Sequence, residues 1–288
     1  MKSIIFKCRG CTADLHKFLG QLPHKNKFAN VRLAGELAAG ELYECNKCHL
    51  LGRYPVLDVK EYNNLYENLN SQVWISDKKR LRKDQLLVKS MIEQREWKQY
   101  NILDIGCYTG DLLASLTENF NKYGVEMSKD AGYVASQNGI KIISNNLYDI
   151  NTQIKFDLIV AVDVLEHTHS PADFLVGLFK FLAPHGEIIV STGNADNWVW
   201  KRLKSKFWYS SFYEHISFIS LTWLEKFCVD NGFTVTKIEK FSYTKLTIKS
   251  PFKILISAFL ATVGFKVERL SNFSKDHFCF SIKLNEQY

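Results

Sequence analysis

Hydrophobic residues in the second half of the chain fall in short continuous runs separated by polar and glycine-containing stretches. The runs cover residues 102–105, 123–126, 156–163 and 186–191. Apolar runs of this length, bounded by turn signals, are typical of strands that are buried on both faces. The pattern therefore predicts an α/β fold, in which helices cover both sides of a sheet.

The segment before these runs has helical spacing. Apolar residues recur at intervals of three and four within 61–69 and again within 81–92. A basic run from Lys78 to Lys83 opposes the second stripe, and such a run usually forms a solvated helix face. We therefore expect a helical connector over residues 59–100.

The loop after the first predicted strand is bounded by glycines. Gly106 and Gly110 permit a tight turn, and Asp111 follows where a carboxylate favours the start of a helix. A strand, a glycine loop and a helix in this order build the crevice in which α/β sheets bind adenosine-containing cofactors. The spacing fits neither the dinucleotide fingerprint nor the P-loop. Glu126 ends the next strand, where a carboxylate binds ribose hydroxyls.

Together, these motifs resemble class I S-adenosylmethionine-dependent methyltransferases. The segments that carry the resemblance are 102–107 with Gly110 and Glu126, 162–167 with Pro171, 182–186, and 231–233. The resemblance covers roughly residues 80–282. It implies a seven-stranded, doubly wound, Rossmann-like sheet, with the methyl donor lying over the carboxyl ends of the strands.

The resemblance also implies which residues bind S-adenosylmethionine. The loop from Gly106 to Gly110 would pass under the methionine part, Glu126 would bind the ribose, and Met127 would pack on the adenine. The expected set is Asp104, Gly106, Cys107, Gly110, Glu126, Met127, Asn146, Leu147 and Asp163. Two positions depart from the family pattern, which usually has a glycine at Tyr108 and an acid at Asn146. An asparagine oxygen can still accept a hydrogen bond from the adenine amino group.

Four of the seven cysteines form two C-x-x-C pairs near the start of the chain. They are Cys8 with Cys11, and Cys45 with Cys48. Paired knuckles in a chain without an export signal predict one structural zinc ion held by four thiolates, with a redox dithiol as the alternative. A metal would stabilise a zinc-ribbon-like module, residues 1–58, that is too small for a large core. This layout resembles methyltransferases with an N-terminal zinc-binding module, among which are enzymes that methylate nucleotide-linked sugars or polysaccharide.

Composition adds little to this picture. Of 288 residues, 46% are hydrophobic and 23% are charged, and the formal net charge is +7. No apolar stretch reaches the ~20 residues of a membrane span, and the longest, 254–265, we interpret as a packed helix. The start of the chain has no long apolar leader segment, so we expect a cytoplasmic protein. The expected parts are the module 1–58, the connector 59–100 and a methyltransferase domain 101–288; the sequence leaves the oligomeric state open.

Candidate groups for the methyl acceptor lie in two short polar segments. Glu166 and His167 follow the third of the apolar runs, and Tyr213, Glu214 and His215 follow an aromatic-rich stretch. Histidine can take a proton at neutral pH, and a neighbouring carboxylate would orient it. We predict that His215 is the proton acceptor, or binds the acceptor, with Glu214 holding its orientation. His167 is the alternative, and either histidine can instead simply bond a backbone carbonyl.

Three functions remain open from the sequence. The first is an enzyme that methylates a sugar, a nucleotide-sugar or a surface glycan, whose phosphate groups would meet the basic residues of 201–206. The second is an RNA methyltransferase with the zinc module as its RNA-binding arm, for which the charge of +7 is weak support because no RNA-binding motif is present. The third is a non-catalytic donor-binding protein, supported only by Tyr108 and Asn146.

Overall fold

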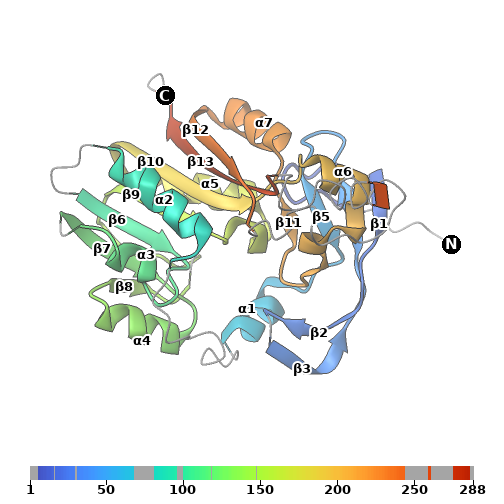
Figure 1. The fold of residues 1–288 in the computed structure, drawn as a ribbon, viewed down its shortest axis with the longest axis horizontal. Coiled ribbons are helices and arrows are strands. Elements are labelled where there is room, and N and C mark those ends of the chain that lie inside the picture. Colours follow the sequence, from blue (N-terminus) through green and yellow to red (C-terminus); the bar gives the residue numbers. More distant parts are fainter. Residues whose placement is uncertain are drawn as a thin grey trace.

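A central sheet flanked by helices and a smaller β-rich part beside it make up the described structure (Figure 1). The computed structural model describes residues 6–15, 17–29, 31–67, 81–95, 100–117, 119–146, 148–243, 259–260 and 275–285. The basic residues Lys78–Arg80, Leu147 and most of the apolar segment 254–265 lie outside these ranges.

The central sheet has seven strands in the order β12-β13-β10-β9-β6-β7-β8. Strands β6 to β10 run parallel to one another, whereas β13 is antiparallel to both β10 and β12. The strands are β6 (Tyr100–Ile105), β7 (Phe120–Val125), β8 (Lys141–Ser144), β9 (Phe156–Val162), β10 (Leu182–Gly193), β12 (Phe233–Phe241) and β13 (His277–Leu284). The predicted fold class, a seven-stranded Rossmann-like sheet, is confirmed.

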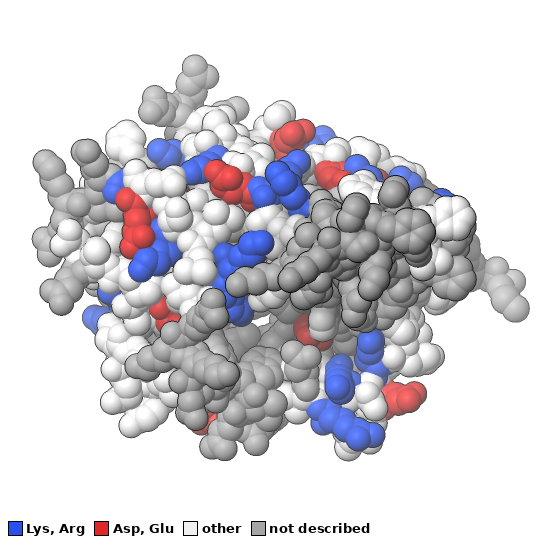
Figure 2. All heavy atoms as spheres, viewed as in Figure 1, with Lys and Arg blue, Asp and Glu red and all other residues white. Residues whose placement is uncertain are grey.

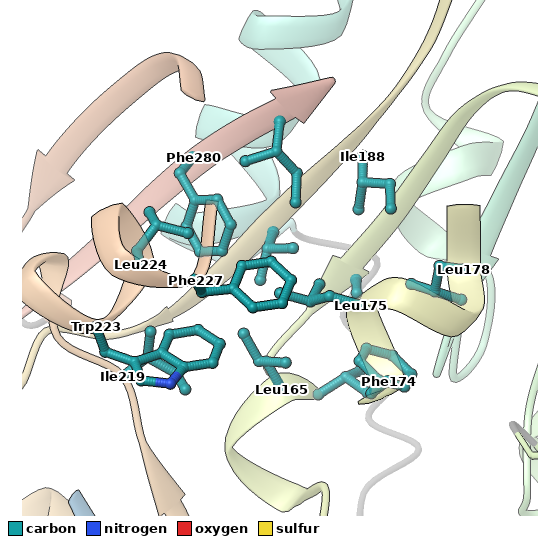
Figure 3. Packing of buried hydrophobic residues seen from close by; sticks show 14 of the residues in the cluster. Leu165, Phe174, Leu175, Leu178, Ile188, Ile219, Trp223, Leu224, Phe227 and Phe280 are labelled. Atoms are coloured by element: carbon teal, nitrogen blue, oxygen red, sulfur yellow. The ribbon is translucent and has the colours of Figure 1, made fainter. Parts of the chain in front are cut away.

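Helices cover both faces of this sheet. Successive residues of β9 alternate between two hydrophobic clusters, since Ile159 and Ala161 face one and Leu158 and Val160 face the other. The first cluster is closed by α5 (Pro171–Phe179) and α7 (Leu221–Asn231), whose side chains meet the strands in Figure 3. The second is closed by α2 (Lys83–Glu93), α3 (Asp111–Ala114) and α4 (Lys129–Gln137). This burial on both faces explains why the strands are apolar almost throughout.

Local signals set the ends of the helices. Ser128, Ser170 and Ser220 cap α4, α5 and α7 through their hydroxyls, each stabilising its helix by about 1 kcal/mol. Gly232 ends α7 with φ +72°, the left-handed conformation that glycine adopts without strain. The expected connector helices also form, as α1 (Val59–Glu67) and α2.

The N-terminal part shares a sheet with the second half of the chain. Its strands are β1 (Lys17–Gln21), β4 (Glu41–Glu44) and β5 (Leu51–Tyr54), and β5 pairs with β11 (Ser217–Phe218). A separate hairpin is formed by β2 (Lys25–Phe28) and β3 (Val31–Leu37). The helix α6 (Trp198–Leu203) and the 3-10 turns η3 (Lys204–Lys206) and η4 (Trp208–Ser211) lead from the sheet towards β11. The domain boundaries expected from the sequence stay a prediction.

The surface carries both signs of charge. Basic and acidic side chains are interspersed over much of the face drawn in Figure 2. A small basic group overlies the hairpin, where the exposed Lys27 and Arg32 lie opposite each other in register. Within the described ranges, none of the helices has the length and apolar character needed to span a membrane.

Candidate active site

One cavity of about 650 Å³ opens at the carboxyl ends of β6, β7 and β9. It is lined by the loop after β6, the end of β7, the turn after β9, helix α1 and the segment 208–215. Ligands of open α/β sheets bind at this edge, and the volume is in the range of small-molecule sites. The two regions that the sequence assigned to donor and acceptor therefore share one space.

The glycine loop has the backbone that its sequence predicts. Gly106 has φ +69° and Gly110 has φ +77°, where Gly110 also precedes the first turn of α3. A Cβ added at Gly106 would lie 2.8 Å from Cγ2 of Val164, so only glycine fits there. Tyr108 keeps the glycine-like conformation with φ +52°, at a cost of about 1–2 kcal/mol. Tyr108 therefore adopts a left-handed backbone conformation that a glycine at this position would adopt without strain.

Glu126 lines the part of the cavity where the sequence predicts the donor. One carboxylate oxygen accepts the N–H of Tyr108 and the other accepts that of Ser128, both at 2.8 Å. Burial raises the pKa of Glu126, and these two backbone hydrogen bonds oppose the rise. Each oxygen has a further lone pair, so the carboxylate can still accept hydrogen bonds from a ligand. Nearby, burial and the charge of Glu126 raise the pKa of Asp104 to about 8.

The structure brings most of the expected donor residues together. Those that line the cavity are Asp104, Gly106, Cys107, Glu126, Met127 and Asp163. Gly110 and Asn146 are not part of the lining formed by the described residues, and Leu147 lies outside those residues. The side-chain oxygen of Asn146 accepts the N–H of Tyr148 at 2.9 Å and so stabilises the turn after β8.

In the part of the cavity where the sequence predicts the acceptor, Glu166 is fully buried and is held by two hydroxyl groups. One of its oxygens accepts a hydrogen bond from Tyr209, and the other accepts one from Thr192 at 2.9 Å. It lies in η2 (Leu165–His167), the turn after β9. Glu166 lies close to two histidines. One carboxylate oxygen of Glu166, one ring nitrogen of His167 and one ring nitrogen of His215 all lie within 4.8 Å of one another.

His215 is held in one tautomer. Its Nδ1 lies 3.0 Å from the carbonyl oxygen of Tyr209, which can only accept, so Nδ1 carries the proton and Nε2 of the neutral ring has a free lone pair. Burial, reinforced by the neighbouring His167, holds the pKa of His215 well below its usual value. The ring is therefore neutral at pH 7 and can accept a proton.

His167 is anchored in the same way from the other side. Its Nδ1 lies 2.9 Å from the carbonyl oxygen of Glu214 and 2.9 Å from the hydroxyl of Tyr66. The rings of His167 and His215 meet edge to face, with their centroids 4.9 Å apart. Both histidines line the cavity, so both remain candidates for contact with the acceptor.

Two expectations for the 213–215 segment need correction. The Tyr209 carbonyl, and not the Glu214 carboxylate, orients His215; Glu214 instead offers its carbonyl oxygen to Tyr62 and His167. The ring of Tyr213 is buried under the guanidinium of Arg53, 4.9 Å away, and is not part of the described cavity lining. The Glu214 side chain does line the cavity.

Three site residues were missed or misjudged from the sequence. Tyr62 and Tyr66 of α1 reach the cavity, where Tyr62 bonds the carbonyl oxygen of Glu214 and Tyr66 bonds His167, whereas their spacing indicated only a helix. Arg82 belongs to the run interpreted as a solvated face. Its Nη2 lies 3.0 Å from carboxylate oxygens of both Asp84 and Asp163, and it lines the cavity. No local signal distinguishes Arg82 from its basic neighbours.

A family model described as a methyltransferase domain matches residues 66–238. The chain belongs to this methyltransferase family. The matched residues contain the glycine loop, Glu126 and both histidines, and residues from each of these line the cavity.

Curated relatives of this methyltransferase are more distant and partial. The ubiquinone biosynthesis O-methyltransferase of Rickettsia conorii is 28% identical over 100 residues, which cover 32% of this chain and 35% of that protein. The protein of the same name from Rickettsia bellii is 25% identical over 121 residues, covering 40% and 50%. The chain therefore spans a third to a half of the length of the curated relatives it matches.

Solved structures share the fold of the methyltransferase domain. A complex between the Trm112 methyltransferase activator of Haloferax volcanii and a protein described as a methyltransferase matches with a TM-score of 0.56 and 12% identity, covering 78% of this chain and 98% of that one. Coclaurine N-methyltransferase, bound to N-methylheliamine and SAH, matches with a TM-score of 0.50 and 11% identity, covering 79% and 81%. At such identities the likeness concerns the fold alone.

The four predicted metal ligands converge in the N-terminal part. The sulfurs of Cys8, Cys11, Cys45 and Cys48 all lie within 4.8 Å of one another, and two pairs are 3.5 Å apart. A tetrahedral zinc ion with Zn–S bonds of about 2.3 Å separates its sulfurs by about 3.8 Å, so the cluster fits this ion. All four cysteines are free thiols, and three are buried, unlike the accessible thiols of redox sites.

Backbone N–H groups around the cluster point to two of its sulfurs. The N–H of Gly10 points to Cys8, and those of Lys47 and Cys48 point to Cys45, at 3.3–3.4 Å. The hydrogen bond between Cys8 and Cys48 lowers the pKa of Cys8 to about 5 and raises that of Cys48, so without a metal one thiolate of this pair is favoured. Thiolate is the form that binds a metal.

Proposed function

We propose that this protein is an S-adenosylmethionine-dependent methyltransferase that methylates a hydroxyl oxygen of a small molecule or glycan. The observation that carries the proposal is the neutral His215, whose Nε2 is free to accept a proton in the same cavity as the glycine loop and Glu126. Membership of the methyltransferase family supports the donor.

The chemistry asks little of the protein beyond placement and one proton acceptor. The sulfonium of the donor is already activated, so the acceptor oxygen must be aligned with the methyl carbon and water excluded. The O–CH₃ bond forms as the S–CH₃ bond breaks, and the hydroxyl proton passes to Nε2 of His215. The buried carboxylate of Glu166 would stabilise the imidazolium that results, because opposite charges attract more strongly in a buried site of low dielectric constant than in water.

The walls of the acceptor side favour a ring-shaped, hydroxyl-bearing acceptor. Aromatic side chains from three segments line the cavity and offer faces and edges for stacking: Tyr62, Tyr66, Tyr148, Trp208, Tyr209 and Phe212. We prefer a sugar, free, nucleotide-linked or in a glycan, because the layout resembles sugar methyltransferases. A phenolic acceptor is the second candidate, because the curated relatives are named ubiquinone biosynthesis O-methyltransferases.

A product-mass screen tests these assignments. Protein and donor are incubated with separate panels of nucleotide-sugars, glycans and phenols, and a gain of one methyl group identifies the acceptor class. A filter-binding assay with RNA tests the RNA methyltransferase alternative. If calorimetry shows no binding of S-adenosylmethionine, the proposal is wrong. If the protein binds the donor but methylates no compound in any panel, a non-catalytic donor-binding protein is favoured.

The pH dependence of turnover should report the buried histidine. His215 must be neutral to accept a proton, and its pKa is lowered well below the ordinary value of about 6.5. Turnover should therefore stay constant as the pH falls to 6.5 and decrease only below that value. The measurement is kcat against pH, with circular dichroism at each pH to show that the protein stays folded. An acid limb centred above pH 7 would exclude His215 as the proton acceptor.

The cysteine cluster is assigned a structural zinc ion. Protein purified without chelator should contain about one zinc per chain, because four converging thiolates close the coordination shell. Cys45→Ser should lose the metal and lower the melting temperature, whereas Cys228→Ser, which alters a buried thiol outside the cluster, should keep it. Elemental analysis that finds no zinc in the parent protein would refute the assignment.

A further inference from the structure

The segment that carries His215 is fastened from the N-terminal part of the chain. The carbonyl oxygen of Ile216, the next residue, accepts the N–H of Arg53 in β5 at 3.0 Å. The N–H of Ile216 in turn donates to the carbonyl oxygen of Glu166 at 2.9 Å. The backbone next to His215 is therefore held between β5 and the turn after β9.

Two arginines from the N-terminal part strengthen this attachment. Arg9 lies inside the first C-x-x-C pair, and its guanidinium donates to the carbonyl oxygens of Arg53, at 2.9 Å, and of Ile216. Arg53 is fully buried and donates to the carbonyl oxygens of Ser210 and Phe212 at 3.2 and 3.3 Å. The guanidinium groups of Arg9 and Arg53 thus donate hydrogen bonds to backbone carbonyl oxygens within the segment 210–216 and to that of Arg53 itself.

Within the described ranges, no carboxylate acts on the charge of Arg9, whereas the charge of Glu214 acts favourably on that of Arg53. Among the described residues, no ion pair joins Arg9 or Arg53 to an acid, and Nε of each has no hydrogen-bond partner. Arg9 instead lies over the ring of Tyr54, 4.4 Å from its centroid, and directly follows Cys8 of the cluster in the sequence. A zinc ion bound by four thiolates carries a net charge of −2, which would supply the missing negative charge beside Arg9.

We infer that Arg9 is a positioning residue that couples metal binding at the cysteine cluster to the placement of His215. The metal fixes the knuckle that carries Arg9, the guanidinium fixes the carbonyl of Ile216, and the adjacent imidazole is thereby aimed at the acceptor. The N-terminal module then acts on the acceptor half of the reaction and leaves the donor half, built on the glycine loop, untouched. The inference rests on the role of His215 in the proposed function.

Substitution of Arg9 tests the coupling. Arg9→Met removes both the charge and the two donors, and a small displacement of a reacting group costs about 10²-fold in rate. We expect turnover to fall by about that factor and zinc affinity, measured by competition with a chelating dye, to weaken, while donor affinity by calorimetry stays at the parent value. Arg9→Lys keeps the charge but cannot donate from two guanidinium nitrogens to the two carbonyl oxygens at once. It should therefore retain zinc while recovering only part of the turnover.

A matched control and a metal-removal experiment complete the test. Lys7→Met removes a positive charge from the same knuckle, but its ion pair with Asp14 is exposed, so zinc affinity and turnover should not change. In the parent protein, stripping zinc should shift the NMR signals of the His215 ring, and adding zinc should restore them. This measurement needs no substitution, so it holds even if Arg9→Met does not fold.

The outcomes separate the inference from the function on which it rests. The coupling would be overturned if zinc-loaded Arg9→Met turned over substrate at the parent rate. It would also be overturned if the NMR signals of His215 did not change when zinc is removed. If His215→Ala is fully active, the assignment of the proton acceptor fails instead. If His215→Ala is inactive and Arg9→Met is as active as the parent, only the coupling fails.

Discussion

Replacing His215 by alanine should lower turnover by about 10²–10⁴-fold, the usual range for loss of a general base. The reason is geometric, because the Tyr209 carbonyl fixes the proton on Nδ1 and leaves Nε2 as the acceptor in the cavity. Donor affinity should stay at the parent value, since the imidazole lies outside the glycine loop. The measurement is kcat with the acceptor found in the product-mass screen, together with calorimetry of the donor.

Two further experiments make this result specific. Free imidazole added to His215→Ala should restore part of the turnover, because the truncated side chain leaves space for it. His167→Ala is the matched control, since its ring is adjacent and anchored in the same manner. If His167→Ala abolishes turnover and His215→Ala does not, the two roles must be exchanged. If neither histidine matters, positioning alone accounts for the rate.

Replacing Gly106 by valine should weaken donor binding by about 10²-fold. Valine at φ +69° is strained, and its Cβ would lie 2.8 Å from Val164, so the loop must move from its place under the donor. Calorimetric titration with S-adenosylmethionine and its demethylated product measures the effect. Because the glycine loop is local to the donor side, zinc content should not change.

A second glycine provides the control for Gly106. Gly177 lies in α5, and a Cβ added there meets no atom within 4 Å. Gly177→Val should therefore bind the donor like the parent protein and show that an added side chain is harmless away from the cavity. Parent-like affinity in both variants would mean that the donor site has been placed wrongly.

The sequence was informative where function depends on the local backbone. The apolar runs predicted β6, β9 and β10, and the glycine spacing predicted a loop whose left-handed residues are now visible at Gly106 and Gly110. The C-x-x-C pairs predicted four sulfurs that do converge. In each case, neighbours within a few residues determine the feature, so the pattern can be recognised without knowing the fold.

The parts that escaped prediction depend on contacts between distant segments. Glu214 is next to His215 in sequence and was the natural choice to orient it, but the chain turns so that a carbonyl six residues earlier does so. Tyr66 and His167 are separated by 101 positions, yet their side chains meet at 2.9 Å. Arg82 pairs with Asp163 across a similar gap. No periodicity encodes such pairs, because tertiary packing alone brings them together.

The pairing of β5 with β11 also bears on the order in which the protein forms during synthesis. β5 ends at Tyr54 and its partner begins at Ser217, so at 5–20 residues per second the first strand waits about 10–30 s for the second. All four cysteines of the cluster have been made by then. A ribosome-bound chain arrested between α4 and β9 should therefore already hold zinc but leave the edge of β5 open to protease. The metal would thus hold the N-terminal part together during the time in which the edge of β5 has no partner strand.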